Sequence, residues 1–134
     1  LYLLNLSLFS AVGWRLYDIQ IADSRKYKTL SENNQIDLEI IDLRTLRPID
    51  RPTIVASVKK TGRVLIVHED TKALGIGSEL SAIIAEDAFD YLDAPILRIA
   101  GPEVPAMPFA ASLEDIFMPN TETIIETAKK IMAY

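Results

Sequence analysis

The feature that most constrains the fold is a short, almost continuous apolar run at residues 63–67 (RVLIV). A strand with one face in water shows alternating apolar and polar residues, and this run does not alternate. Its composition is typical of a strand that is covered on both faces, as strands of parallel sheets are. Parallel neighbours are joined by a crossover connection, usually a helix. The run therefore predicts an α/β fold.

The residues before this run predict a strand followed by a helix. Residues 36–43 have the composition of a strand. Pro48 follows this strand and breaks the chain before the next element. Asp50 stands where an N-cap residue belongs, ahead of the helical segment RPTIVASVKK. Gly62 follows that segment, in the position where glycine commonly ends a helix.

The residues after the run predict an amphipathic helix over residues 78–92. One stripe of this helix is apolar and comprises Leu80, Ile83, Ile84, Ala88 and Tyr91. The acidic residues of the segment lie elsewhere around the helix and are interpreted as a solvated face: Glu79, Glu86, Asp87 and Asp90. Such a helix packs its apolar stripe against a sheet.

The rest of the chain continues the alternation. Residues 95–100 predict a strand, residues 101–119 a proline-rich loop with one turn of helix, and residues 121–133 a closing helix. At the other end, residues 1–12 predict a buried strand and residues 14–34 a helix. The order βαβαβαβα predicts a three-layer αβα sandwich with right-handed crossovers. With no linker to divide it, we expect residues 1–134 to form a single domain, a fragment of a longer protein since residue 1 is leucine.

Composition and charge exclude several classes of function. The net charge of -5 argues against a nucleic-acid partner, which needs a basic face, and suits a basic protein partner. The apolar residues 1–12 are too few to span a bilayer. The chain has no cysteine, which excludes disulfides, thiolate metal ligands and a cysteine nucleophile, and is compatible with a reducing cytoplasm.

Two glycines suggest a nucleotide site. Gly75 and Gly77 follow a predicted strand and open a helix, but the third glycine of the dinucleotide motif G-x-G-x-x-G is replaced by Leu80. We therefore favour a sharp turn of the backbone, with at most free N–H groups for an anion. A free-standing nucleotide-binding or phospho-acceptor domain that uses Asp70 with both glycines is the alternative from another functional class.

His68 is the single histidine of the chain and the best placed residue for a general base. It precedes Glu69 and Asp70 at the carboxyl end of a predicted strand, where open α/β sheets bind ligands. A metal site would need further ligands, and neither H-E-x-x-H nor the nucleophile motif G-x-S-x-G occurs. We therefore favour a histidine that is hydrogen-bonded in a loop or lies at a subunit interface.

Four segments follow one another in a specific order: IDLRTLRPID, VKKTGRVLIVHED, GIGSELSAIIAEDAF and YLDAPILRIAGPEVPAMPF. Together they resemble the carboxyl-terminal domain of the beta subunit of the thiamine diphosphate-dependent decarboxylase component of 2-oxoacid dehydrogenase complexes. The beta part of an alpha-beta fusion would look the same. The resemblance extends over residues 36–134, and residues 1–35 are poorly matched. The alternative is the carboxyl-terminal domain of a transketolase or of a deoxyxylulose phosphate synthase. The segments LDAP and AGPEVP weigh against this alternative.

The resemblance implies a mixed five-stranded sheet with one antiparallel strand and a domain that performs no chemistry. The parent enzyme would bind thiamine diphosphate and magnesium in other domains, and this chain lacks the G-D-G motif with following asparagines that holds them. We therefore expect no catalytic, cofactor or metal residues here. The parent would decarboxylate a 2-oxoacid oxidatively and acylate lipoyl, in the bacterial cytoplasm or the mitochondrial matrix. The segment V-H-E-D favours 2-oxoisovalerate over pyruvate as the substrate of the parent enzyme, because pyruvate-specific members of the family often lack its histidine.

The resemblance further implies a role in assembly. Such a domain dimerises, contacts the alpha subunit or domain, and docks the subunit-binding domain of the dihydrolipoyl acyltransferase. The docking residues would be Asp93 of L-D-A-P and the terminal carboxylate of Tyr134. From local sequence alone, Asp93 is a turn residue before Ala94 and Pro95. The loop residues Met107, Pro108 and Phe109 are candidates for the self-association surface.

Overall fold

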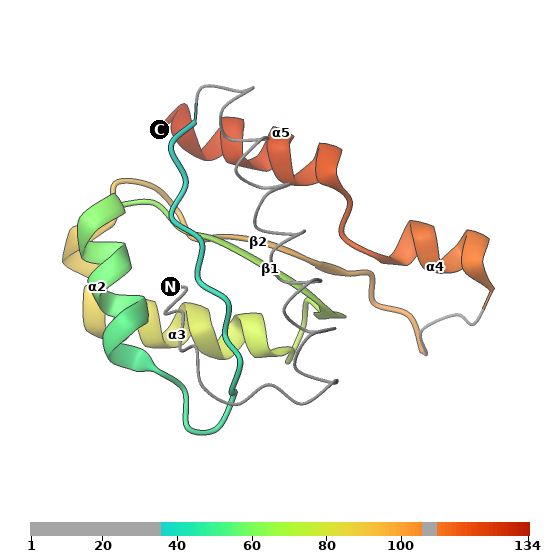
Figure 1. Ribbon diagram of the computed structural model, residues 1–134, viewed down its shortest axis with the longest axis horizontal. Helices are drawn as coiled ribbons and strands as arrows, with labels where there is room; N and C mark the ends of the chain where they lie inside the picture. Colours follow the sequence, from blue (N-terminus) through green and yellow to red (C-terminus); the bar gives the residue numbers. More distant parts are fainter. Residues whose placement is uncertain (1–35, 106–109) are drawn as a thin grey trace, which may run out of the picture. The chain divides into compact units, whose positions relative to one another are not determined.

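The computed structural model describes residues 36–105 and 110–134 (Figure 1). The chain divides into two compact units, residues 1–49 and 50–134, and each is described here by itself. In the first unit, residues 36–49 form neither helix nor strand, so the strand predicted at residues 36–43 is wrong. Extended backbone becomes a strand only when it pairs with a neighbour, which an apolar composition cannot ensure. The strand and helix predicted for residues 1–34 lie outside the described residues.

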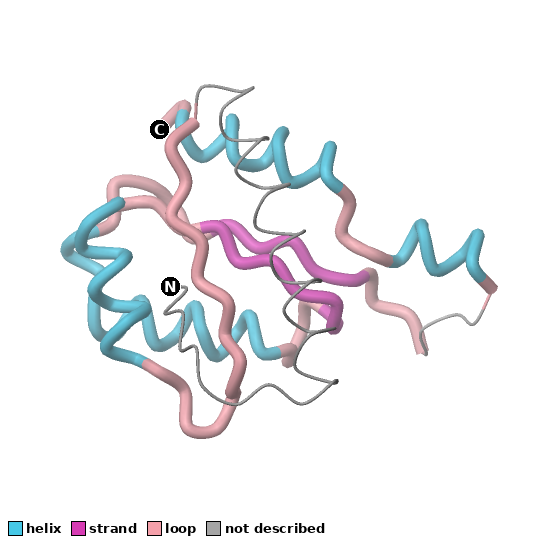
Figure 2. Tube along the Cα trace, in the orientation of Figure 1, coloured by secondary structure: helices cyan, strands magenta, loops and turns pink. Residues whose placement is uncertain are grey.

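The second unit contains an alternating series of helices and strands. In chain order these are α2 (Arg51–Thr61), β1 (Leu65–Thr71), α3 (Ile76–Ala88), the 3-10 helix η1 (Phe89–Tyr91), β2 (Leu97–Gly101), α4 (Ala111–Phe117) and α5 (Thr121–Met132). The two strands of the described residues pair in parallel, as the apolar run predicted (Figure 2). The α/β class is therefore confirmed. The five-stranded mixed sheet stays a prediction, as does the single domain.

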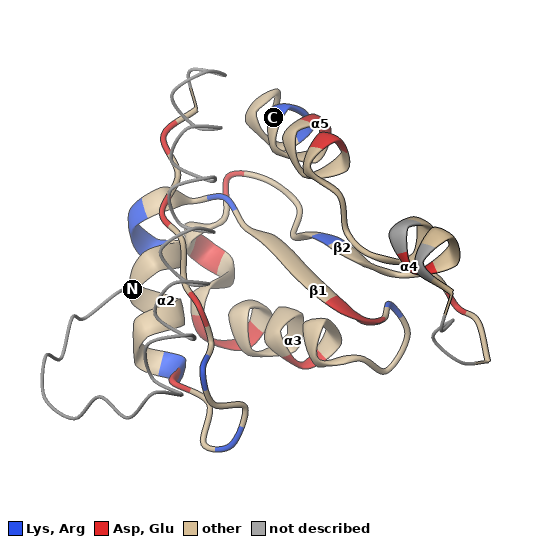
Figure 3. Cartoon of the chain, turned by 45° about the vertical axis from the view of Figure 1, so that its right-hand side comes forward, with Lys and Arg blue, Asp and Glu red and all other residues tan. Residues whose placement is uncertain are grey.

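Helices flank both sides of the strand pair. Helix α3 packs on β1 from one side and α2 packs on α3, while α5 contacts both strands from the other side (Figures 1 and 3). The core between them is aliphatic. Its buried residues include Ile54, Val58, Ile66, Leu80, Ile83, Ile84, Ile99, Ala128 and Ile131. This burial supplies most of the stability of the unit, because apolar area removed from water is the main favourable contribution to folding.

Helix α2 begins and ends as predicted. The Asp50 carboxylate accepts hydrogen bonds from the Thr53 backbone N–H at 3.2 Å and from the Thr53 hydroxyl at 2.7 Å. These two bonds, the hydroxyl first, lower the pKa of Asp50 below its ordinary value of 3.8. At the other end Gly62 adopts a left-handed φ of 65°, and its N–H donates to Val58 O at 2.8 Å. Glycine adopts this conformation without steric cost.

The apolar stripe of α3 is confirmed in four of its five members. Leu80, Ile83, Ile84 and Ala88 are buried, whereas Tyr91 is 50% exposed. The helix ends at Ala88, so the helical period no longer applies at residue 91. The Tyr91 ring instead lies under the Lys59 ammonium, 4.7 Å from the ring centroid.

Two acidic residues on the exposed face of α3 have a partner. The Arg51 guanidinium of α2 lies 3.1 Å from Glu86 Oε2 and 3.0 Å from Asp87 Oδ2. Both carboxylates raise the pKa of Arg51, Asp87 most strongly. All three side chains remain exposed. This exposed cluster links the two helices in addition to their apolar contact.

The remaining elements differ from prediction in length. Strand β1 continues to Thr71, three residues beyond the histidine. Helix α4 has seven residues where one turn was expected, and α5 agrees with the predicted closing helix. The Asn120 side chain caps α5 by accepting from the Thr123 N–H at 2.8 Å. No helix within residues 36–105 and 110–134 is long and apolar enough to cross a membrane.

Candidate partner-binding site

The predicted docking residue Asp93 lies at the amino edge of the sheet, where both strands begin. It precedes β2, and Arg63 precedes β1. Because the strands are parallel, the residues that lead into them come together. The Asp93 N–H donates to the Gly62 carbonyl at 2.7 Å, which joins the two connections.

The Asp93 carboxylate is open to solvent but has a neighbour of opposite charge. Its side chain is 65% exposed, and its Oδ2 lies 3.6 Å from Arg63 Nη1. The Arg63 side chain is 30% exposed, and its Nε is buried without a hydrogen-bond partner in the described residues. An exposed pair at this distance contributes little to stability. Asp93 is therefore accessible to a further cation.

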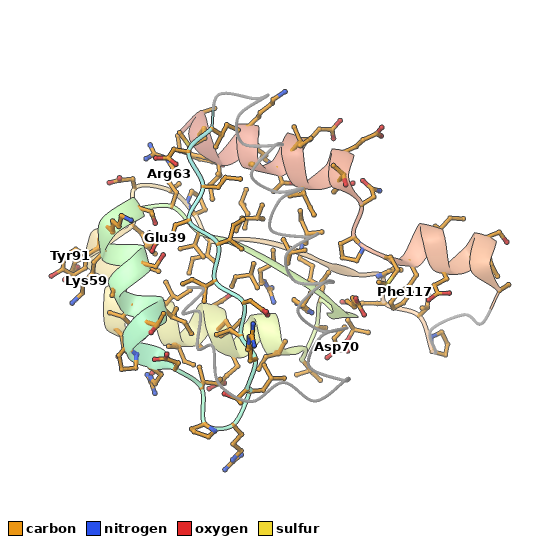
Figure 4. The ribbon with its side chains drawn as sticks, in the orientation of Figure 1. Glu39, Lys59, Arg63, Asp70, Tyr91 and Phe117 are labelled. Carbon is orange, nitrogen blue, oxygen red and sulfur yellow. The ribbon has the colours of Figure 1, made fainter. Side chains whose placement is uncertain are left out.

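Tyr134 lies at the same edge. Helix α5 packs on both strands, and the chain ends beside the start of the sheet, at the end where Figure 4 labels Arg63 (Figures 1 and 4). The Tyr134 residue is 62% exposed. The surroundings also carry positive charge, from Lys59 and Lys60 in the last turn of α2 and from Lys129 and Lys130 in α5 (Figure 3). The amino edge is thus exposed and charged with both signs.

His68 is the middle residue of β1, so it lies within the strand rather than in a loop. The loop interpretation is therefore wrong, and the interface interpretation stays a prediction. Both ring nitrogens are buried and have no hydrogen-bond partner among the described residues. The ring packs on the start of α3, where a Cβ at Gly77 would lie 2.7 Å from His68 Cδ2 and one at Gly75 would lie 3.0 Å from Cε1.

This packing explains why residues 75 and 77 are glycines. Each leaves room for the His68 ring, and Gly75 also lies close to the Thr71 carbonyl. The two glycines thus have a packing role within the fold, and the nucleotide-binding alternative stays a prediction.

Some other polar groups of the carboxyl edge have partners within the fold. Arg98 Nη1 donates to the Lys72 carbonyl at 3.0 Å and to Ser78 Oγ at 2.7 Å. Asp70 Oδ1 accepts from the Thr71 N–H at 2.7 Å. Glu69 is exposed.

Within residues 36–105 and 110–134, no group of three or more His, Cys, Asp and Glu side chains is placed to hold a metal ion. The expectation that cofactor and metal are bound elsewhere stays a prediction. The predicted surface residues Met107 and Phe109 lie outside the described residues.

Comparison with known proteins assigns the chain to a family. The family "Transketolase, C-terminal domain" matches residues 23–124, so the chain belongs to it. Pyruvate dehydrogenase E1 component subunit beta of Rickettsia felis is 42% identical over 93% of this chain and 38% of its own length. That of Rhizobium meliloti is 50% identical over 75% of this chain and 22% of its own length.

A relative with another substrate in its name is equally similar. The 2-oxoisovalerate dehydrogenase subunit beta of Bacillus subtilis is 46% identical over 76% of this chain and 31% of its own length. The resemblance to decarboxylase beta subunits is therefore confirmed. The family match starts at residue 23, earlier than the resemblance seen in the sequence. The chain spans less than two fifths of the length of these relatives.

Sequence reasoning missed Gly62 and Arg63 as part of the candidate site. Gly62 was interpreted only as the end of a helix, and Arg63 as the first residue of a strand. Their contacts with Asp93 come from the parallel pairing of β1 and β2. One signal in the sequence could have indicated these contacts. Gly62 and Arg63 stand before one predicted strand, Asp93 stands before the other, and parallel strands bring the residues before them together.

Proposed function

We propose that this chain is the assembly domain of a 2-oxoacid dehydrogenase decarboxylase component and that it docks the dihydrolipoyl acyltransferase. The observation that carries the proposal is the exposed Asp93 carboxylate at the amino edge of the sheet, in a chain similar to decarboxylase beta subunits. The Tyr134 carboxylate would be the second acidic group if the native chain ends there. Two exposed carboxylates can receive arginine and lysine side chains of a basic binding domain in charge-assisted pairs.

The proposed parent enzyme decarboxylates a 2-oxoacid oxidatively and acylates lipoyl on its partner. Thiamine diphosphate and magnesium would be bound by domains other than this one, in the bacterial cytoplasm or the mitochondrial matrix. The preference for 2-oxoisovalerate over pyruvate stays a prediction. Identities of 42% and 50% to pyruvate dehydrogenase subunits lie on either side of the 46% to the 2-oxoisovalerate enzyme.

We propose two further partners, a second copy of the beta subunit and the alpha subunit or domain. Helix α4 supports this, because Leu113 is 53% and Ile116 is 77% exposed. The two residues are three positions apart, so they lie on one side of the helix. Exposed apolar side chains next to one another favour association. In the sequence, helix α4 follows shortly after Met107 and Phe109.

The docking proposal is tested by surface plasmon resonance. The acyltransferase binding domain is immobilised and bound by the full parent enzyme, native, Asp93→Asn, or lacking Tyr134. We expect Asp93→Asn to weaken binding by about 2 kcal/mol, mainly through a faster off-rate, because docking desolvates the charge. Asp90→Asn is the matched control, since it removes an exposed carboxylate of the neighbouring helix η1. Equal affinities for native enzyme and both site variants would exclude docking at these residues.

A further inference from the structure

The Asp93 carboxylate occupies the place that a side chain at position 62 would take. A Cβ at Gly62 would collide with Asp93 Oδ2 and would lie 2.9 Å from Asp93 Cγ, well inside the separation of about 3.5 Å or more that carbon atoms prefer. The next neighbour is the Tyr91 carbonyl at 3.4 Å, an ordinary contact. The collision therefore involves the carboxylate and not the backbone.

Gly62 and Arg63 make two further contacts with Asp93. The Gly62 carbonyl accepts the Asp93 N–H at 2.7 Å, and Arg63 lies beside Oδ2 at 3.6 Å. Oδ2 therefore lies against both Gly62 and Arg63. Because the Asp93 side chain is 65% exposed, the carboxylate in this orientation remains open to an incoming cation.

We propose that Gly62 is a positioning residue for partner binding, which keeps the Asp93 carboxylate in the orientation that receives a cationic side chain of the partner. The inference rests on the proposed docking function. Any L-residue at position 62 must displace the carboxylate. The displacement costs little folding energy, because the Asp93 side chain is 65% exposed and can rotate into solvent. The fold survives, and the carboxylate points elsewhere.

The backbone of Gly62 makes a two-variant test necessary. Its φ of 65° is strained for alanine, whereas asparagine tolerates the left-handed region far better. Gly62→Ala therefore combines strain with displacement of the carboxylate. Gly62→Asn introduces the same Cβ with less strain. If Gly62 has a purely structural role, the two variants should differ in their affinity for the partner. If it has a positioning role, both variants should weaken binding to a similar extent.

The experiment measures binding of the acyltransferase binding domain to the full parent enzyme. Gly62→Ala and Gly62→Asn are each made with Asp93 present and with Asp93→Asn, and thermal unfolding is recorded in parallel. With Asp93 present, both variants should weaken binding about tenfold, within the coupling usual for residues in contact. With Asp93→Asn, the same changes should alter affinity less than about twofold, since no charge remains to be misplaced.

Each other result has a defined meaning. If the position 62 changes weaken binding equally in both backgrounds, or only in step with the unfolding temperature, Gly62 is merely structural and the inference is wrong. If Asp93→Asn alone leaves affinity unchanged, the docking proposal itself fails. The two failures are thus distinguished within one set of proteins.

Discussion

The two edges of the β1–β2 sheet use their polar residues in opposite ways. At the carboxyl edge, the His68 ring is packed against glycines of α3 and Arg98 donates to groups of the same domain. At the amino edge, Asp93 is 65% and Tyr134 is 62% exposed. At the carboxyl edge His68 and Arg98 serve the fold, although Glu69 and Asp70 are exposed there. At the amino edge the proposed docking residues are accessible.

This difference runs against the usual rule for open α/β sheets, in which ligands bind at the carboxyl ends of the strands. In this domain the start of α3 is filled by His68, and the loop before it is closed by Arg98. Substitutions at the carboxyl edge should therefore change stability, and those at the amino edge should change docking. A substitution at the carboxyl edge that changes docking, or one at the amino edge that changes stability, would contradict this division of roles.

The largest expected effect is on the stability of Gly77→Ala. Its Cβ would collide with the buried His68 ring and lie 3.4 Å from Ile66 Cγ2. Overpacking of this kind typically costs about 1–3 kcal/mol, against a gain of about 1 kcal/mol from alanine in a helix. We expect a net loss of about 1 kcal/mol in the free energy of unfolding, measured with urea, with docking unchanged.

The control for this prediction is a background in which Gly77→Ala should no longer destabilise the protein. In a His68→Ala background the ring is gone, so Gly77→Ala should be neutral or stabilising through helix propensity. A similar loss in both backgrounds would show that the histidine is not the cause. Weaker docking by a fully folded Gly77→Ala enzyme would break the separation between the edges.

The second prediction is that Asp93→Asn barely changes stability. Its pair with Arg63 spans 3.6 Å, and Asp93 is largely exposed. Exposed ion pairs contribute about 0–1 kcal/mol, and asparagine keeps the shape of the side chain. The free energy of unfolding should change by about 0.5 kcal/mol or less, although docking weakens. A loss of stability as large as that of Gly77→Ala would show that Asp93 serves the fold.

Local signals in the sequence predicted the helices well. Asp50 and Gly62 marked the ends of α2, and the spacing of Leu80, Ile83, Ile84 and Ala88 marked the buried face of α3. These features depend on residues within a few turns of one another, where propensity and periodicity act directly. The parallel pairing was also predicted from the apolar run at residues 63–67. The burial on both faces expected of that run is incomplete, since Val67 is 40% exposed.

Side-chain contacts between distant residues were not predicted. Residues 36–43 were expected to form a strand but form neither helix nor strand, and Tyr91 lies outside the apolar stripe because the helix ends at Ala88. The packing of His68 on Gly77 and of Asp93 on Gly62 joins separate elements. Such contacts are set by tertiary packing, which no local pattern contains. The docking residues came from the family resemblance, and their surroundings came from the structure.

The smallest expected effect concerns Asp50, which belongs to neither edge. Hydrogen bonds from the Thr53 hydroxyl and N–H lower the pKa of its carboxyl below 3.8. A lowered pKa in the folded state gives a contribution that is complete above pH 3.8 and is lost as the pH falls through the folded pKa. Asparagine caps a helix about as well and does not titrate.

Asp50→Asn should therefore unfold at nearly the native urea concentration at neutral pH and lose less stability than the native chain in acid. Urea midpoints at neutral pH and well below pH 3.8 provide the measurement. Thr53→Val, which removes the hydroxyl that contributes most to the lowered pKa, should flatten the acid dependence in the same direction. Parallel acid profiles for the native chain and Asp50→Asn would mean that the acid sensitivity arises elsewhere, and the carboxylates of the two edges would be the next groups to replace.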